Sequence, residues 1–393
     1  MTIVFNPNDR DFYVAPRPLY KRLRDEAPVF WSEHTRWWAL SRYDDVLRAT
    51  RDWKVYSHAA GGGSSGGSGE RFREFPFLLM FDPPRHTALR NWIRPLLAPA
   101  RLLAMEEAVR ALTRELLAPF EQAGEMDLTR DFAARLPAIV IADIVGLPRD
   151  DAPMLTAWVD DLADSGHPEF PDSAARAINH IADYYVRTFA ARRDGPAGDD
   201  LLWHLVEAVR TGVMPENEAV GFGLLMTIAG AETTTKMIGN TAILLQQHPD
   251  QRALLLERPE LLPNAIEEAL RYNSTTHIMT RTLTTDVELH GRTMRAGDTV
   301  ALLYNSANND ERQFTDPERF DITRDIGGRH IAFGGGIHAC LGAPLARLEL
   351  RVAFEEILAR WPGFSVHPER GERYFNPVPQ GFRRLPMTLA LRT

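Results

Sequence analysis

The only cysteine of the chain, Cys340, lies in the segment FGGGIHACLG, between three consecutive glycines and a fourth glycine two residues later. A structural cysteine packs as a small hydrophobic side chain and needs no glycines around it. Glycine lets other groups approach the backbone closely. The pattern therefore indicates that something large and flat comes close to the sulfur atom.

The residues after Cys340 show the spacing of a helix with one buried face, at Leu341, Leu345, Leu348 and Val352. We therefore expect Cys340 at a helix N-terminus, where the helix dipole lowers the pKa of a thiol. Zinc would need three further ligands, and the chain has no second cysteine. Haem needs only one thiolate. A structural cysteine and a nucleophile activated by His338 stay open at this point.

A second unusual segment, AGAETTTK, begins at Ala229 in the middle of an apolar helix that we expect to run from Pro215 to Gln247. Gly230 costs about 1 kcal/mol relative to alanine in a helix interior. Thr233 can donate a hydrogen bond to the Ala229 carbonyl and bend the helix. A close helix crossing would explain the small residues. Glu232 beside Thr233 is expensive to bury, however, and an acid next to a hydroxyl could deliver protons.

In this order and spacing, the motifs resemble those of bacterial cytochromes P450, which are haem-thiolate monooxygenases. The cysteine signature F-G-x-G-x-H-x-C-x-G is matched from Phe333 to Gly342, and the oxygen-binding helix signature A-G-x-[DE]-T-[TS] is matched from Ala229 to Thr234. The resemblance implies a haem b whose iron is bound by Cys340. It assigns proton delivery to Glu232 and Thr233, haem contacts to Phe333 and Gly342, and a structural network to Glu268, Arg271 and Arg319.

The resemblance also assigns four residues to the haem propionates: His86, Arg90, Arg281 and His338. This assignment agrees with physical chemistry, because buried carboxylates need cationic or hydrogen-bonding partners. The family fold is mainly α with a minor β lobe. We therefore expect residues 1–393 to form a single domain, although the length alone would suggest more than one.

Periodicity along the chain agrees with such a fold. Residues 102–120 are expected to form one long helix, because their apolar side chains recur three or four residues apart. Strand-like segments are few, at 36–43, 286–291, 298–305 and 387–392. The Gly/Ser-rich residues 59–70 are interpreted as a mobile loop near the substrate entrance.

The composition indicates a soluble, cytoplasmic protein. A net charge of -8 gives no reason to expect a nucleic acid or a membrane as partner, and the sequence shows no targeting segment. No motif for a flavin or nicotinamide domain is present, so electrons are expected from an external ferredoxin and its reductase. Arg94, Arg347 and Arg351 are candidate docking residues for an acidic ferredoxin.

The expected substrate is a hydrophobic small molecule such as a terpenoid, steroid, fatty acid or polyketide. The expected reaction inserts one oxygen atom from O2, with C–H hydroxylation as its form. Two alternatives are a peroxide-driven peroxygenase of the same fold and a haem-binding sensor without catalysis, which would need neither Glu232 nor Thr233. By analogy with the family, the candidate lining residues are Phe77, Leu79, Leu225, Ala229, Ile278, Met279 and Val378.

Overall fold

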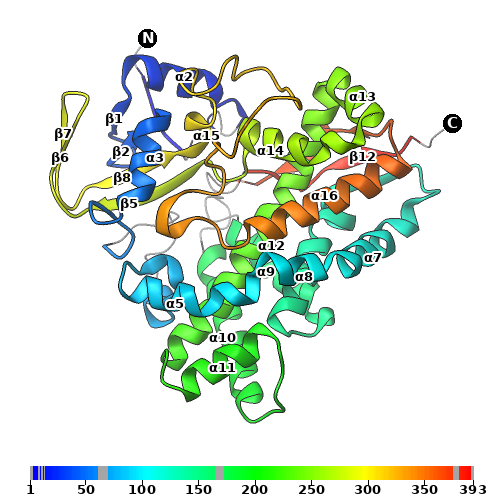
Figure 1. The fold of residues 1–393 in the computed structure, drawn as a ribbon, viewed down its shortest axis with the longest axis horizontal. Coiled ribbons are helices and arrows are strands. Elements are labelled where there is room, and N and C mark those ends of the chain that lie inside the picture. Colours follow the sequence, from blue (N-terminus) through cyan, green and yellow to red (C-terminus); the bar gives the residue numbers. More distant parts are fainter. Residues whose placement is uncertain are drawn as a thin grey trace.

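The computed structural model describes residues 3–7, 9, 12, 14–60, 70–163, 172–374 and 380–390. Helices form most of the molecule, and a smaller lobe of strands lies at one side (Figure 1). The expectation of a mainly α protein with a minor β lobe is confirmed. The helices that bear on the site are α3 (Tyr43–Arg51), α5 (Arg85–Ile93), α8 (Arg135–Val145), α9 (Ala152–Ala163), α10 (Ser173–Arg193), α12 (Glu216–Gln247), α14 (Leu262–Asn273) and α16 (Ala343–Arg360).

Helix α12 spans 32 residues and runs through the middle of the molecule (Figure 1). It begins directly after Pro215, which is its N-cap residue, so the predicted span is confirmed to within one residue. Over much of its length it is buried on several sides, as is usual for a helix that is apolar all round. It contributes to the largest apolar core, together with residues of α8, α10, α14 and α16.

The single helix predicted over residues 102–120 is interrupted, so this prediction was wrong in part. Helix α6 (Pro99–Ala104) ends at Met105, whose N–H bonds the Leu102 carbonyl at 3.0 Å. Helix α7 (Glu106–Leu117) begins with the same residue as its N-cap, and a 3-10 turn over Ala118–Phe120 follows. The apolar face continues across the break, because Leu102 and Val109 are both buried. Periodicity therefore did not reveal the interruption.

The β lobe contains a five-stranded sheet with the strand order β1-β2-β8-β5-β3. Strand β2 runs parallel to β8, and the other neighbours are antiparallel. The predicted strands at 36–43 and 298–305 are present but shorter, because α3 begins at Tyr43 and the short helix α15 (Tyr304–Ala307) begins at Tyr304. The five strands are β1 (Val29–Ser32), β2 (Trp37–Leu40), β3 (Tyr56–Ser57), β5 (Ile278–Leu283) and β8 (Thr299–Leu303).

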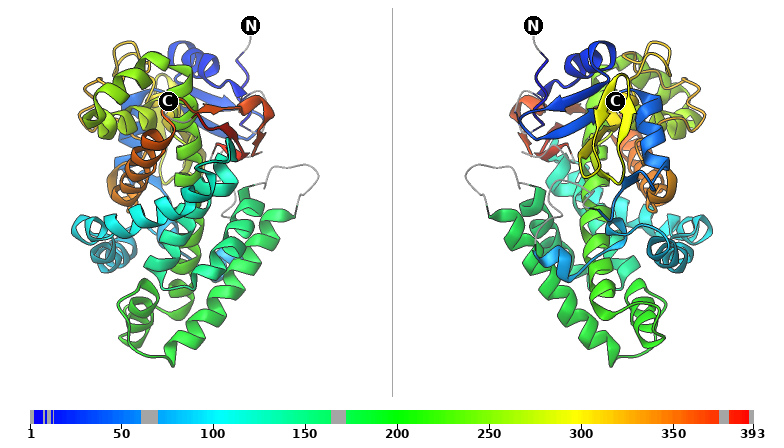
Figure 2. Two further views of the ribbon diagram at one scale, coloured as in Figure 1. Left: turned by 90° about the vertical axis from the view of Figure 1, so that its right-hand side faces the viewer. Right: turned by 90° about the vertical axis from the view of Figure 1, so that its left-hand side faces the viewer.

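The other strands form small sheets, seen from two sides in Figure 2. The predicted segments 286–291 and 387–392 supply β6 (Val287–Leu289) and β12 (Pro386–Thr388). Strand β6 pairs with β7 (Arg292–Met294), and β12 lies between β4 (Glu125–Asp127) and β9 (Ser365–Val366). Strands β10 (Glu372–Arg373) and β11 (Phe382–Arg384) form another pair.

Two expectations are not decided by the fold. Residues 61–69 of the Gly/Ser-rich segment lie outside the described residues, and the single domain over 1–393 stays a prediction. Within the ranges that the structure describes, no helix has both the length and the apolar character needed to cross a membrane.

Candidate active site

The loop that carries Cys340 is closed by a backbone hydrogen bond. The Cys340 N–H donates to the Phe333 carbonyl at 2.9 Å, and Gly342 is the N-cap residue of α16. Gly334 and Gly336 adopt φ angles of 70° and 64°, which side chains other than glycine rarely tolerate. The local sequence therefore folds into a tight loop that ends at a helix N-terminus, as predicted.

The glycines of this loop do not all face the thiol. A Cβ atom at Gly335 would lie 2.6 Å from Thr50 Oγ1, and one at Gly336 would overlap the Thr50 carbonyl. These two glycines therefore allow α3 to pack against the loop. The interpretation that the glycines clear space for a flat group beside the sulfur does not hold for this pair.

The expected lowering of the thiol pKa is not what the structure gives. The Cys340 side chain is partly open to solvent, but protein atoms surround it closely enough that desolvation raises the pKa of its thiol. The backbone N–H groups of Gly342 and Ala343 and the charge of Arg90 act in the opposite direction with smaller effect. A bound metal cation favours the thiolate strongly, so this thiol is better suited to coordination than to acting as a free nucleophile.

Three histidine rings gather beside this loop. The ring centroids of His58 and His86 lie 3.9 Å and 4.2 Å from that of His338. Both ring nitrogens of each histidine are buried and lack a hydrogen-bond partner among the described residues. Such orphaned buried nitrogens are uncommon and indicate a polar ligand. Within the described part of the chain, His338 forms no hydrogen bond with Cys340, which disfavours the nucleophile alternative. The described residues also include no group of three or more His, Cys, Asp or Glu side chains arranged to hold a metal ion.

His58 belongs to the cluster without having been predicted from the sequence. It follows β3, where Ser57 Oγ donates to Asp82 Oδ2 at 2.5 Å and the His58 N–H donates to Asp82 Oδ1 at 3.3 Å. Asp82 thereby fixes the turn that places the His58 ring against His338. The sequence holds no motif around His58, and only the proximity of the three rings in the fold reveals it.

Two arginines add positive charge to the three-histidine cluster (His58, His86 and His338). Burial is the main cause that lowers the pKa of His86 to about 4, followed by the charge of Arg90. Burial, His86 and Arg281 lower the pKa of His338 to about 2. Neutral imidazoles beside guanidinium groups can donate hydrogen bonds to carboxylates. The predicted propionate residues are therefore brought together, and they fit the carboxylates of a haem.

The predicted acid and the predicted hydroxyl, which are neighbours on α12, have different surroundings. Thr233 Oγ1 donates to the Ala229 carbonyl at 3.1 Å, as expected from the sequence. Ala229 is exposed and Thr233 is half-buried. Helix α12 therefore has an open face here, which carries both residues and is accessible to solvent. Glu232 is only 8% exposed and forms an ion pair with Lys236 one turn further along. A Cβ atom at Gly230 would overlap the Ile141 side chain of α8, so the helix-crossing interpretation holds for this glycine.

The structure brings two of the three predicted network residues together. Glu268 and Arg271 are both fully buried and form two hydrogen bonds, of 2.7 Å and 2.8 Å. The Arg319 side chain does not join them, because it is 67% exposed and lies 4.0 Å from Asp321. Arg324 takes this place, since its Nε donates to Glu268 Oε1 at 3.2 Å.

A second buried acid links α16 to α12. Glu349 is fully buried, and neither carboxyl oxygen has a hydrogen-bond partner among the described residues. Thr234 on α12 lies near enough to favour the ionised form weakly, but burial dominates and raises the pKa of Glu349 to about 8. Glu349 is therefore mostly protonated at neutral pH. Glu349 lies on α16, nine residues after Cys340, and Thr234 lies on α12. The cysteine helix and the predicted oxygen-binding helix are therefore in contact here.

The candidate substrate residues fall into different environments. Phe77, Leu79, Leu225 and Met279 are half-buried, and Ala229 is exposed, as expected for residues near an opening. Ile278 is 3% exposed and lies in the apolar core of the β lobe, which favours a structural role for it. Val378 lies outside the described residues.

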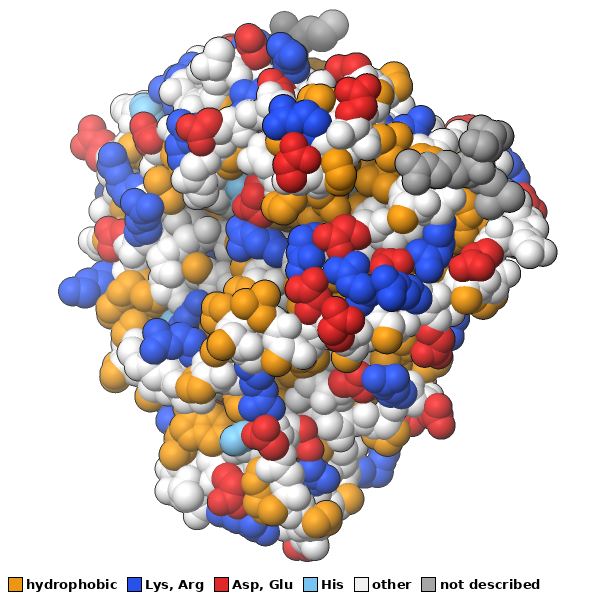
Figure 3. All heavy atoms as spheres, turned by 45° about the vertical axis from the view of Figure 1, so that its right-hand side comes forward, with side chains coloured by type: hydrophobic (Ala, Val, Ile, Leu, Met, Phe, Trp, Pro, Cys, Tyr) orange, Lys and Arg blue, Asp and Glu red, His pale blue; other side chains and the backbone are white. Residues whose placement is uncertain are grey.

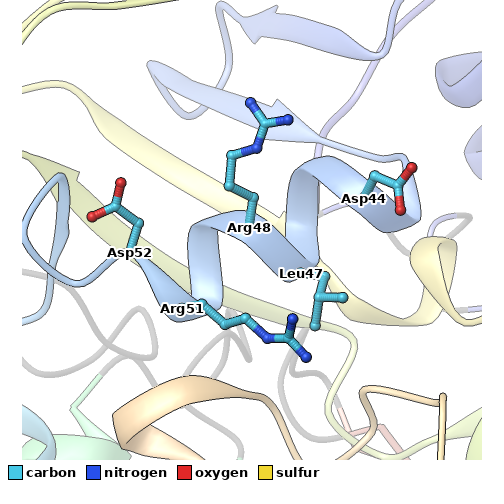
Figure 4. Close-up of a pocket in the computed structure, with 5 residues that line it drawn as sticks. All are labelled: Asp44, Leu47, Arg48, Arg51 and Asp52. Atoms are coloured by element: carbon cyan, nitrogen blue, oxygen red, sulfur yellow. The ribbon is translucent and has the colours of Figure 1, made fainter.

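A surface hollow of about 550 Å³ lies over α3 and is lined by Asp44, Leu47, Arg48, Arg51 and Asp52 (Figure 4). Arg48 points to one side of the helix, whereas Leu47 and Arg51 point to the other. None of the predicted site residues lines this hollow. It is therefore a feature of the surface rather than part of the candidate site.

The candidate docking arginines are largely neutralised within the chain. Arg347 forms two hydrogen bonds with Glu267, at 2.6 Å and 2.9 Å. Arg351 pairs with Glu106 and Glu355. Arg94 is exposed. The face shown in Figure 3 likewise mixes basic and acidic side chains.

Comparison with known proteins identifies the family. The model of the family "Cytochrome P450" matches residues 171–386. The chain is 34% identical to "Putative cytochrome P450 123" of Mycobacterium tuberculosis, over 99% of this chain and 98% of that one. It is 33% identical to linalool 8-monooxygenase of Pseudomonas putida, over 95% and 96% of the two chains.

Solved structures agree with this relationship along the whole chain. The structure of CalO2 superposes with a TM-score of 0.89 at 31% identity and covers 99% of both chains. The cytochrome P450 PksS of Bacillus subtilis superposes with a TM-score of 0.88 at 30% identity, over 98% of this chain and 100% of that one. With the cysteine loop and the cluster of histidines and arginines in place, the chain belongs to the cytochrome P450 family of oxidoreductases.

Proposed function

We propose that this protein is a monooxygenase that inserts one oxygen atom from O2 into a C–H bond of a hydrophobic small molecule. The observation that carries this proposal is the three-histidine cluster with Arg90 and Arg281, because it offers a site for the propionates of a haem beside Cys340. Haem bound by Cys340 would supply the activation of O2. The reaction consumes O2, two electrons and two protons, and it yields the hydroxylated product and water.

The chain's own residues hold the cofactor and handle the protons. His58, His86 and His338 would donate hydrogen bonds to the propionates of a haem, and Arg90 and Arg281 would balance their charge. Phe333 and Gly342 shape the loop on either side of Cys340. Thr233 presents its hydroxyl on the open face of α12, and Glu232 is the acid next to it.

Relatives support the reaction class and broaden the choice of substrates. Similar proteins include linalool 8-monooxygenase and cyclomarin C epoxidase, which is 35% identical over 94% of this chain. Neighbouring structures include a complex with testosterone and one with a fatty acid carried by acyl carrier protein. We take the substrate to be a hydrophobic molecule that contacts Phe77, Leu79, Leu225, Ala229 and Met279. The electrons come from an external ferredoxin and its reductase.

The proposal is tested with Thr233→Ala in the haem-loaded protein, with substrates first found by titration of the Soret band. Without the hydroxyl, reduced oxygen is expected to leave as hydrogen peroxide, so reductant is consumed while product falls by about tenfold or more. Product, peroxide and reductant are measured in one reaction. Cys340→Ser, which removes the thiolate, is the control that abolishes product.

Other outcomes separate the alternatives. Equal product per electron in the parent protein and in folded, haem-loaded Thr233→Ala would refute the role of Thr233. Product formation with peroxide far above that with O2 and reductant would favour the peroxygenase. Haem binding with no turnover of any ligand would favour the sensor.

A further inference from the structure

The acid beside Thr233 is held by a lysine of its own helix. Lys236 Nζ donates a hydrogen bond to Glu232 Oε1, and the two side chains are 1% and 8% exposed. The two residues are four positions apart, so they lie on the same side of α12. The position of the Glu232 carboxylate is therefore set by a buried cation rather than by solvent.

Lys236 is itself fixed by the C-terminal part of the chain. A Cβ atom at Gly381 would overlap the aliphatic stem of Lys236, so the backbone packs directly on this stem. The ammonium group lies 4.1 Å from the centre of the Tyr374 ring, within the range of a cation–π contact. The Tyr374 hydroxyl donates to Asp160 Oδ1 on α9. Lys236 is therefore also held by residues outside α12, namely Gly381 and Tyr374.

Lys236 has neighbours besides Glu232. Asp160 on α9 faces the Lys236 ammonium, and the Tyr374 ring lies against it. Arg383 on β11 also lies over the Tyr374 ring, 5.4 Å from its centre. Loss of Glu232 would leave Lys236 with the Tyr374 ring and Asp160. Loss of Lys236 would take from Glu232 the cation that offsets the cost of burying its charge.

We propose that Lys236 is a positioning residue that keeps Glu232 ionised and oriented for proton delivery to the open face of α12. This inference rests on the proposed function, because Glu232 acts as the proton-delivering acid only in a monooxygenase. A buried acid that holds its proton too tightly is a weak donor. Lys236 therefore determines whether Glu232 can both take up and release protons near neutral pH.

The first test measures the charge of Glu232 without turnover. Infrared difference spectra of the haem-loaded, resting protein are recorded for the parent and for Lys236→Met, which keeps the length of the stem. The variant is expected to show an additional C=O band of a protonated carboxyl group, besides the band of protonated Glu349 that all these proteins share. The additional band should be absent in the parent, in Lys236→Arg and in the double variant Lys236→Met/Glu232→Gln. Lys54→Met, at an exposed lysine, is the matched control and should resemble the parent.

The second test measures product per electron as a function of pH. Lys236→Met is expected to lose about tenfold in this ratio at neutral pH and to recover as the pH rises, because Glu232 then ionises. Lys236→Arg should restore the parent ratio. A variant that had only lost packing would show a lower ratio at every pH.

The outcomes separate this inference from the function on which it rests. Absence of the additional carboxyl band in a folded Lys236→Met variant would overturn the positioning role of Lys236. A clear additional band with unchanged product per electron would instead overturn the role of Glu232 in proton delivery. Tyr374→Phe keeps the aromatic ring and is expected to leave Glu232 ionised. An additional carboxyl band in this variant would contradict the view that the ring, rather than the hydroxyl, supports Lys236.

Discussion

Glu349 is expected to destabilise the folded protein in a manner that depends on pH. Its carboxyl group is fully buried and has no charged partner among the residues that the structure describes, and burial raises its pKa from 4.5 to about 8. Between these two values the unfolded chain releases the proton and the folded chain keeps it. Stability therefore falls as the pH rises, by about 1.4 kcal/mol per pH unit. Below the unfolded pKa this destabilisation is absent.

Glu349→Gln removes the charge while keeping the shape of the protonated acid. From the two pKa values, the gain in stability at pH 7 is about 3 kcal/mol, and it increases towards pH 8. Urea unfolding of the parent and the variant, followed by tryptophan fluorescence at pH 5 and pH 8, measures this difference at each pH. Glu257→Gln is the control, because Glu257 is exposed.

The dependence on pH is the decisive part of this prediction. A difference in stability between the parent and Glu349→Gln that stays constant from pH 5 to pH 8 would refute the raised pKa. A variant that is less stable than the parent at every pH would show that Glu349 makes a favourable interaction as a carboxylate. Either result would contradict a neutral carboxyl group in contact with α12.

Two further predictions follow from residues that the sequence did not assign correctly. Arg324→Ala is expected to lower the free energy of unfolding by about 2–3 kcal/mol, because buried Glu268 loses a charged partner. Arg319→Ala should change the free energy of unfolding by less than about 0.5 kcal/mol. Denaturant unfolding of both variants tests this, and equal effects would contradict the network. His58→Ala is expected to speed haem release about 10- to 100-fold, because one hydrogen bond to a carboxylate is lost. The rate is measured by transfer of haem to apomyoglobin, and His34→Ala, at an exposed histidine, is the control. Equal rates in both variants would refute the contact between His58 and the haem propionates.

Local patterns were sufficient for the residues that are defined by their neighbours in sequence. The Cys340 loop and the α12 segment around Thr233 could be predicted because tight turns, helix periodicity and the motif spacing all lie within short stretches. The hydrogen bond from Thr233 to Ala229 follows from the geometry of a helix alone. Such features do not depend on how distant parts of the chain pack.

Residues that depend on long-range packing could not be assigned in the same way. His58 meets His338 only because Asp82 fixes the turn after β3. Arg319 and Arg324 lie five positions apart in one loop, and sequence does not show which of them turns inward. The helix N-terminus alone predicts a lowered pKa for Cys340, whereas desolvation by the surrounding protein atoms has the larger effect in the folded chain.

Two signals were present in the sequence and could have been used. Glu349 lies four residues after Leu345 and three before Val352, so it falls on the face that was expected to be buried. Lys236 follows Glu232 by four residues in a mostly apolar part of the helix, and four residues is the spacing of an ion pair. A charged residue on a buried face has to be paired or neutral.

The two central helices meet this requirement in opposite ways. On α12, Glu232 is paired with Lys236, and the cost of burying its charge is offset by a cation. On α16, Glu349 has no such cation among the described residues, and it remains neutral at pH 7. Environments that drive two carboxyl groups into different charge states distinguish a group that accepts protons from one that holds its proton. The carboxyl group that has a cation is Glu232, the residue next to Thr233 along α12, and it is the group that the proposed proton delivery would use.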